Sequence, residues 1–236
     1  MISHIRRHFI ALSALTLLVA APAGAQQDNG PGKKTPVILV VGDSLSAEYG
    51  LARGTGWVAL LEQRLAQEKI QATVVNASVS GDTTAGGRAR LPALLKAHQP
   101  THVVLELGGN DALRGLPLTN TQGNLAWMTE QSQAIGARVL LVGMQMPPNY
   151  GADYGRRFSD LFAAVATQRK AGLVPFLLKG VADAPNPTAL FQPDRIHPRA
   201  EAQPRMLDNV WPELRKLLQA TGSAASAAAG AATAAR

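Results

Sequence analysis

Short apolar runs rich in β-branched residues alternate along this chain with segments whose apolar residues recur at helical spacing. The runs occupy residues 37–41, 73–75, 102–107, 138–143 and 173–178. Three of them are continuously apolar, which is typical of strands in a parallel sheet covered on both faces. Two intervening segments carry a helical apolar face, formed by Trp57, Leu60, Leu61 and Leu65 in one and by Phe158, Leu161, Phe162 and Val165 in the other. This alternation predicts an α/β fold with a doubly wound sheet between helical layers.

The chain of 236 residues is long enough for one domain with a sizeable core, which we place at residues 36–219. The last helix is expected at about residues 199–219, with Pro204 near its start and Pro212 kinking or breaking it. Residues 220–236 form a low-complexity tail of Ala, Gly and Ser. We expect either a frayed helix or no fixed structure there, and assign it no function.

The N-terminus has the features of a secretory signal peptide over residues 1–25. Arg6 and Arg7 precede an apolar run at residues 9–21, and Ala23-Gly24-Ala25 has the small-x-small pattern of a cleavage site. The run is shorter than the roughly 20 residues that a membrane span needs. The arginine pair also fits a twin-arginine signal, so the export route stays open. We expect a flexible leader at residues 26–35 and a periplasmic or secreted protein without stable membrane insertion.

Composition excludes several kinds of chemistry. The chain has no cysteine, which rules out a disulfide, a thiolate nucleophile and a cysteine metal site. Removing residues 1–25 takes away two arginines and no acidic residue, so the formal charge falls from +7 to +5. No block of basic residues is interleaved with aromatic ones, so nucleic acid is not an expected partner. We expect a monomer.

Four short motifs follow the predicted strands or precede the last helix. They are Gly42-Asp43-Ser44, Ser80-Gly81-Asp82-Thr83-Thr84, Gly108-Gly109-Asn110-Asp111 and Asp194-Arg195-Ile196-His197-Pro198. Taken singly, each is ordinary turn or helix-capping chemistry. The loops after the strands of a doubly wound sheet converge on one edge, however. The joint pattern therefore predicts that Ser44, Gly81 and Asn110 meet there.

A serine at such an edge needs a base to become a nucleophile and donors for the oxyanion it creates. The N–H groups of Ser44 and Gly81 and the side-chain amide of Asn110 are three candidate donors. Glycine at position 81 also lets the backbone approach a substrate closely. For Asp43, Asp82 and Asp111 we predict structural roles, Asp43 by ordering the nucleophile turn through backbone N–H groups.

His197 is the candidate base. Asp194, three residues earlier, can accept the Nδ1 proton and leave Nε2 to face Ser44. Pro198 disfavours helical conformation at His197, which places the imidazole at the mouth of the last helix. His98 and His102 are separated by Pro100 and cannot form a helical metal pair, so we interpret them as surface or core residues.

With these motifs the chain resembles the SGNH (GDSL) hydrolases, and within them the secreted group with acyl-CoA thioesterase, lysophospholipase and arylesterase activity. Ser44, Gly81, Asn110 and His197 match the four residues that name the family. The match extends along residues 42–46, 75–83, 91–96, 106–111, 148–151 and 196–198 and covers roughly residues 36–219. Order and spacing agree, which makes the resemblance specific.

The resemblance implies a flavodoxin-like three-layer sandwich with five parallel strands. It implies a Ser44–His197–Asp194 triad, the oxyanion site above, and hydrolysis of esters and thioesters through an acyl-enzyme without metal or cofactor. The resemblance also implies that a loop after the fourth strand moves to cover the acyl chain. We therefore predict substrate contacts for Met144, Met146, Pro147 and Tyr150, the alternative being that the methionines fill the edge of the core.

Two other functions remain open at this stage. The same residues can catalyse carbohydrate O-deacetylation, and the fold can also serve as a non-catalytic lipid- or carbohydrate-binding module. The intact Ser44, Asp194 and His197 argue against the second.

Overall fold

A computed structural model describes residues 35–234 of the chain, with the backbone alone from residue 221 onward. The predicted signal peptide and nearly all of the predicted leader lie outside the described residues. The strands are β1 (Val37–Gly42), β2 (Thr73–Asn76), β3 (His102–Glu106), β4 (Arg138–Val142) and β5 (Gly172–Val174). The helices are α1 (Trp57–Gln67), α2 (Thr84–His98), α3 (Gly109–Leu113), α4 (Leu118–Ala134), α5 (Ala152–Arg169) and α6 (Gln203–Ala234). The 3₁₀ turns are η1 (Pro148–Tyr150), η2 (Pro187–Leu190) and η3 (Ala200–Ala202).

The five strands form one parallel sheet in the order β2-β1-β3-β4-β5. This order confirms the predicted doubly wound, flavodoxin-like fold. The chain leaves β1 toward β2 on one side and returns with β3 on the other. In such sheets ligands bind outside the carboxyl ends of the strands at this switch point. The loops after β1 and β3, which carry Ser44 and Asn110, therefore lie where a site is expected.

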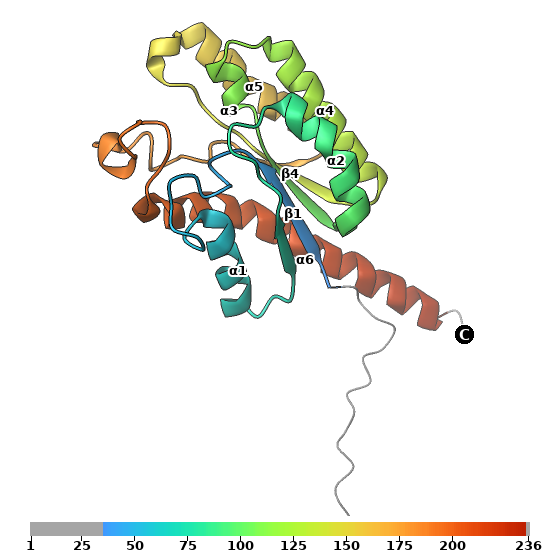
Figure 1. Cartoon of the computed structure of the whole chain (residues 1–236). Coiled ribbons are helices and arrows are strands. Elements are labelled where there is room, and N and C mark those ends of the chain that lie inside the picture. Colours follow the sequence, from blue (N-terminus) through green and yellow to red (C-terminus); the bar gives the residue numbers. More distant parts are fainter. Residues whose placement is uncertain (1–34, 235–236) are drawn as a thin grey trace, which may run out of the picture. The chain divides into compact units, whose positions relative to one another are not determined.

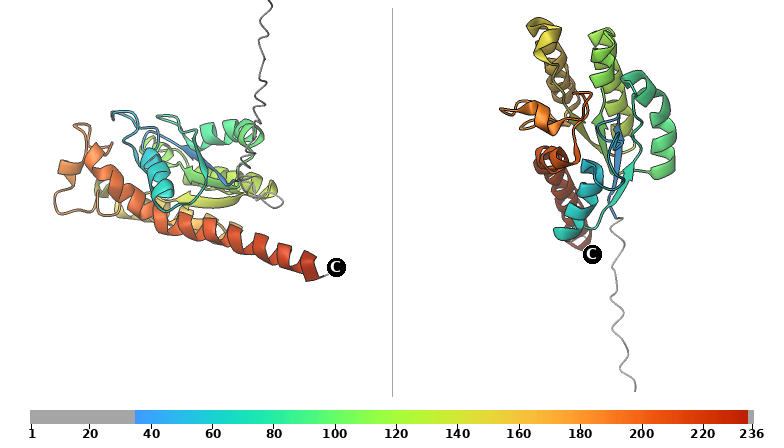
Figure 2. Two further views of the ribbon diagram at one scale, coloured as in Figure 1. Left: turned by 90° about the horizontal axis from the view of Figure 1, so that it is seen from below. Right: turned by 60° about the vertical axis from the view of Figure 1, so that its left-hand side comes forward.

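Helices cover both faces of the sheet, and alternate strand residues point to the two layers. Helices α1 and α6 pack on one face, against Ile38, Val40 and Val104 among others. Helices α2, α4 and α5 pack on the other, against Leu39, Val41 and Leu105. Figures 1 and 2 show the two layers on either side of the strands. Burial on both faces explains why β1 and β3 are continuously apolar.

Two predicted boundaries were wrong. The fifth strand ends at Val174 instead of residue 178, because Pro175 has no N–H to donate to the sheet. The following turn stays against the core, and the Leu177 N–H bonds the Gly143 carbonyl at 2.9 Å. Helix α6 begins at Gln203, after η3, and runs through Pro212 without a break to Ala234.

Candidate active site

The turn after β1 holds Ser44 in a fixed position at the carboxyl edge of the sheet. The Leu45 N–H bonds Asp43 Oδ1 at 3.0 Å, and the Ala47 N–H bonds the Asp43 carbonyl at 2.9 Å. The first bond is the one predicted for Asp43. A Cβ at Gly42 would lie 2.7 Å from Ser46 Oγ, so the turn requires glycine there.

His197 joins Ser44 to Asp194. His197 Nε2 lies 2.8 Å from Ser44 Oγ, and Nδ1 lies 2.7 Å from Asp194 Oδ2. The three side chains come from the turn after β1 and from the segment before η3, which are 150 residues apart in the sequence. The structure thus brings together the three residues predicted as nucleophile, base and orienting acid, with both hydrogen bonds in place.

Asp194 is held in its ionised form. Burial acts to raise the pKa of its carboxyl, but hydrogen bonds from the N–H groups of His197 and Ile196 and from the imidazole outweigh it and lower the pKa to about 2. An ionised carboxylate accepts the Nδ1 proton and directs the Nε2 lone pair toward Ser44. A base in this tautomer can take the serine proton.

Tyr49, which no motif singled out, lies against the imidazole. Its ring centroid is 4.3 Å from that of His197, at an interplanar angle of 39°. Gln192 fixes both partners, because its Nε2 donates to the Tyr49 carbonyl at 2.9 Å and its N–H to the His197 carbonyl at 2.8 Å. The ring thus packs against the imidazole that reaches Ser44. An aromatic residue five positions after the serine was the only sequence signal for it.

The predicted oxyanion donors lie in the loops around Ser44. Asn110, at the start of α3, donates one Nδ2 hydrogen to Asp43 Oδ2 at 3.0 Å, which leaves its second hydrogen available. Gly81 has a φ of +78°, a conformation that favours glycine. Within the described residues, neither the Ser44 N–H nor the Gly81 N–H has a hydrogen-bond acceptor. Three donors around the serine are therefore free to receive an oxygen.

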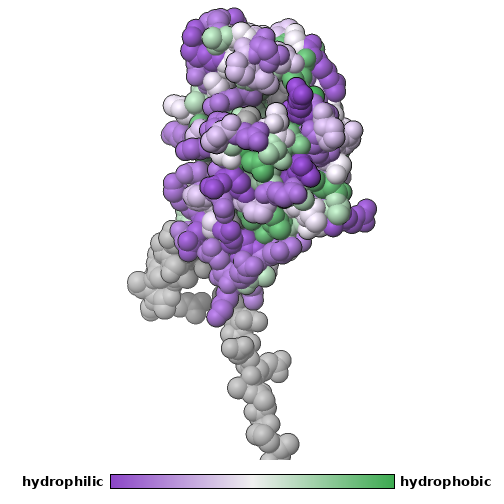
Figure 3. Space-filling model, turned by 90° about the vertical axis from the view of Figure 1, so that its left-hand side faces the viewer, coloured by the Kyte–Doolittle hydropathy of each residue, from purple (hydrophilic) through white to green (hydrophobic). Residues whose placement is uncertain are grey.

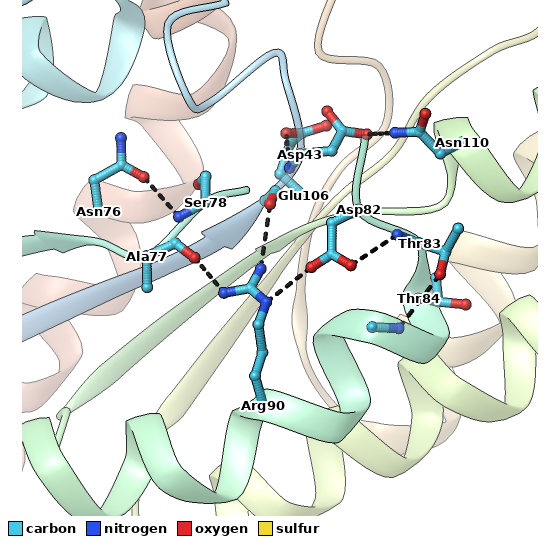
Figure 4. Close-up of polar contacts among 12 residues, drawn as sticks. Asp43, Asn76, Ala77, Ser78, Asp82, Thr83, Thr84, Arg90, Glu106 and Asn110 are labelled. Atoms are coloured by element: carbon cyan, nitrogen blue, oxygen red, sulfur yellow. Dashed lines mark hydrogen bonds and ion pairs between the residues drawn. The ribbon is translucent and has the colours of Figure 1, made fainter. Parts of the chain in front are cut away.

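Arg90 of α2 ties the loops of the site together (Figure 4). Its Nε forms an ion pair with Asp82 Oδ2 at 2.8 Å, and its terminal nitrogens donate to the carbonyls of Ala77 and Gly42. One side chain thus joins the end of β1, the end of β2 and the loop that carries Gly81. This agrees with the structural role predicted for Asp82.

Asp111 forms a second anchor on the far side of Asn110. Its carboxylate accepts from the N–H and the hydroxyl of Thr84 and from the hydroxyl of Thr121. Asp111 thereby connects α3 to the first turns of α2 and α4, the structural role predicted for it. The anchor fixes the helix that presents Asn110.

Two buried carboxyls lie behind the nucleophile turn. Burial raises the pKa of Asp43 to about 6, against the lowering effect of the Leu45 and Asn110 hydrogen bonds. Burial, followed by the charge of Asp43, raises the pKa of Glu106 well above its ordinary value. Ser46 Oγ donates to Glu106 Oε2 at 2.7 Å. Glu106 ends β3 and was missed as part of the site, because it closes an apolar run.

A largely apolar groove of about 540 Å³ opens at the segments that carry Asn110 and His197. We call it the acyl groove. It reaches from Gly109, next to Asn110, to Ile196, next to His197. Met144, Met146 and Pro147 line it, together with Phe176, Leu178 and Phe191. Tyr150 does not line it: this residue lies in η1 and is 39% exposed. Figure 3, which views the carboxyl edge, shows hydrophobic residues surrounded by hydrophilic ones.

The histidines set aside from the sequence lie elsewhere. His102 starts β3 at the amino edge of the sheet, and burial lowers its pKa. Among the residues described, no group of three or more His, Cys, Asp and Glu side chains is arranged to hold a metal ion. The helices in the described part of the chain are all too short or too polar to cross a membrane.

A doubly wound sheet with a Ser–His–Asp set at its switch point defines a serine hydrolase with a flavodoxin-like fold. Residues 40–204 match the GDSL-like Lipase/Acylhydrolase family, and the chain belongs to this family. Its similarity to proteins named as esterases and thioesterases supports an esterase and thioesterase function.

The chain is similar to esterase TesA of Pseudomonas aeruginosa, with 56% identity over 77% of this chain and 89% of the relative. It is 41% identical to an arylesterase of Vibrio mimicus, over 77% of this chain and 89% of the relative. It is 40% identical to thioesterase 1/protease 1/lysophospholipase L1 of Escherichia coli K12, over 77% and 84%. A crystal structure of TesA superposes with a TM-score of 0.74 at 55% identity, covering 77% of this chain and 99% of that one.

Proposed function

We propose that Ser44 is the nucleophile of an acyl-enzyme mechanism, with His197 as general base and acid and Asp194 as the orienting carboxylate. The observation that carries this proposal is the unbroken hydrogen-bonded series Ser44–His197–Asp194, with distances of 2.8 and 2.7 Å. Both distances lie in the hydrogen-bonding range that a general base needs to take up a proton.

In the first step Ser44 Oγ attacks the carbonyl carbon while His197 Nε2 takes its proton. The developing oxyanion accepts hydrogen bonds from the Ser44 N–H, the Gly81 N–H and Asn110 Nδ2. Such donors act because they are already oriented when charge develops. The intermediate then collapses, the C–O or C–S bond breaks, and the imidazolium protonates the leaving alcohol or thiol.

In the second step a water molecule replaces the leaving group. His197 takes a proton from this water as it attacks the acyl carbon, and the same donors stabilise the second oxyanion. Collapse returns the proton to Ser44 and releases the carboxylic acid. This scheme needs no metal or cofactor.

The acyl groove supports aryl esters, acyl thioesters and lysophospholipids as the substrate class. Its apolar lining, with the flexible Met144 and Met146, suits a hydrocarbon chain more than an acetyl group on a sugar. Residues 1–25 support export, so that lysophospholipids and small acyl or aryl esters, not cytoplasmic acyl-CoA, are the proposed natural substrates. We further propose that the exported chain acts as a monomer.

A series of p-nitrophenyl esters from acetate to palmitate, run beside a lysophospholipid, tests the proposal. We expect turnover that increases beyond acetate and is almost absent in Ser44→Ala. A fluorophosphonate probe should label the wild type and not this variant. Activity on acetylated xylan without activity on longer esters would establish the deacetylase alternative. A folded wild type that the probe does not label would point to a non-catalytic module.

A further inference from the structure

A second hollow, of about 690 Å³, adjoins the acyl groove. We call it the outer pocket. It lies between residues 50–52, which follow the nucleophile turn, and the segment that carries Arg195 and Arg199. Thr188, Phe191 and Arg195 line both hollows. Arg195 therefore stands where the outer pocket and the acyl groove meet.

The backbone of Arg195 is in a conformation that disfavours any side chain. Its φ is +59°, one of five such values at non-glycine residues in the described part of the chain. Gln99 and Lys170 have such values where they cap helices, and Glu48 uses its carboxylate to bind the N–H groups of Gly54 and Gly56. Arg195 caps no helix. Glycine would adopt this conformation at lower cost, so the presence of an arginine side chain at this position suggests a role for that side chain.

The guanidinium of Arg195 is exposed and makes no hydrogen bond or ion pair within residues 35–234. The nearby acids are already engaged. Asp194 accepts from Ile196 and His197, and Asp183 accepts from the Gly180 N–H. Arg199, also in the outer pocket, lies 3.7 Å from Glu201. The pocket thus holds two cations against one acid, and the cation at the junction is unpaired.

In the proposed mechanism the leaving group departs toward this pocket. In the proposed mechanism His197 protonates the leaving oxygen or sulfur, so that atom must face the segment around His197. The acyl chain occupies the apolar groove on the other side of Arg195. A leaving group longer than a few atoms then passes Arg195 into the outer pocket.

We propose that Arg195 is a specificity-determining residue that binds a phosphate on the leaving group of the substrate. The planar guanidinium presents a fork of N–H donors that matches phosphate geometry. The inference rests on the proposed function, because the role of His197 as general acid decides which hollow takes the acyl chain and which takes the leaving group. Two substrate classes carry such a phosphate, a lysophospholipid headgroup and a nucleotide-bearing thiol.

Matched substrate pairs test the proposal. Octanoyl-CoA is compared with S-octanoyl-N-acetylcysteamine, which keeps the acyl group and thiol end but lacks the phosphates. Octanoyl lysophosphatidylglycerol is compared with monooctanoylglycerol, all as monomers in solution. We expect Arg195→Gln to lower kcat/KM for the phosphate substrates about fivefold to tenfold, mainly through KM, and to leave the neutral partners unchanged.

Two further variants separate local binding from overall charge. Arg195→Lys keeps the charge and should retain most of the phosphate preference. Lys96→Gln removes the same unit of charge at the end of α2 and should leave the preference intact. The wild-type preference should also decrease with added salt, since an exposed pair is screened.

A loss confined to the lipid pair or to the thioester pair identifies which source of phosphate the pocket accepts, and a loss in both supports a common site. Equal loss on neutral and charged substrates, or no loss on either, overturns the inference. Failure of the proposed function would look different. The wild type would then hydrolyse neither of the two thioesters, or the Ser44→Ala variant would keep full activity.

Discussion

The side chains of Asp43 and Glu106 place two carboxyls side by side in the core, where two negative charges are costly. Glu106 is fully buried and has the more strongly raised pKa, so it keeps its proton near neutral pH. The hydrogen bonds that Asp43 accepts from the Leu45 N–H and from Asn110 lower the pKa of its carboxyl, and so does the electrostatic effect of His197. All three favour the ionised form of Asp43. We infer that the pair carries one negative charge, on Asp43, where it orients Asn110.

Glu106→Gln should make the enzyme more stable at neutral pH. A carboxyl with a raised pKa keeps its proton in the folded state at pH values where the unfolded chain has lost it, so stability falls as pH rises above about 4.3. Glutamine removes this loss and can still accept from Ser46. Urea unfolding from pH 4 to 8 should give a higher free energy of unfolding for the variant than for the wild type, and the difference should increase with pH.

Glu62→Gln is the control, because Glu62 is exposed on α1. It should change stability by less than about 0.5 kcal/mol at every pH. A Glu106→Gln variant that loses stability as pH rises, relative to the wild type, would mean that Glu106 is ionised in the fold.

Asp194→Asn should leave the fold intact and reduce kcat by about 10⁴, as in the serine-protease template. Asn can still accept from the N–H groups of Ile196 and His197, but its amide places a donor against Nδ1. The histidine then carries its proton on Nε2, which faces Ser44. The measurement is kcat on p-nitrophenyl butyrate with thermal unfolding as a check. Asp160→Asn, on the exposed face of α5, should keep full activity. A loss below tenfold would argue against an orienting role.

The Ser44–His197–Asp194 set could be predicted because Ser44 directly follows an apolar strand and the motif with Asp194 and His197 directly precedes the last helix. The rule that loops meet at the carboxyl edge then brings them together. Glu106 and Tyr49 could not be found this way. Their roles depend on which way a loop folds back over the turn, and no local pattern encodes that packing. The same reason explains why Tyr150 lies outside the acyl groove while Pro147 lines it.

At the level of elements, Arg90 is the link between α2 and two strand ends. Its guanidinium serves Asp82 and the carbonyls of Ala77 and Gly42 at once. Such a planar group with five donors suits three acceptors in different directions, whereas a lysine ammonium on a flexible stem does not. The position of Gly81 therefore depends on arginine at position 90.

Arg90→Lys should reduce kcat about tenfold and cost about 1–2 kcal/mol of stability, because the half-buried carbonyls of Ala77 and Gly42 each lose a donor and the Gly81 N–H moves. Denaturant unfolding and ester kinetics measure the two effects. Arg88→Lys, on the same helix but stacked on Trp127 in the outer layer, is the control and should keep wild-type kcat. Equal kcat for both variants would mean that the Gly81 loop is positioned by other contacts.

The apolar periodicity was enough to predict which segments form helices and which form strands. Where each of these elements ends depends on single residues. Strand β5 ends early at Pro175, and the apolar residues after it pack as a turn in the same core. Pro212 does not break α6. Trp211 and Leu214 on either side of it are buried against the sheet, and their packing outweighs the hydrogen bond that proline cannot make.

At the scale of the domain in residues 35–234, the two helical layers depend on different parts of the chain. One layer is formed by α2, α4 and α5 between strands, where the chain is held at both ends. The other consists of α1 and α6, and α6 follows the last strand. Part of one face of the sheet is therefore covered by α6, which is held in place by its apolar packing and by polar contacts such as the Arg64–Asp208 ion pair.

Two truncations should separate the packed part of α6 from its extension. Removal of residues 221–236 should leave stability and kcat near wild type, since the buried Trp211, Leu214 and Leu218 remain. Removal of residues 211–236 deletes all three. At about 1.5–3 kcal/mol for each buried side chain, the loss is comparable to the whole stability of a typical domain. Circular dichroism and ester hydrolysis should then show an unfolded, inactive chain. A folded and active product of the longer deletion would mean that α1 alone can cover this face of the sheet.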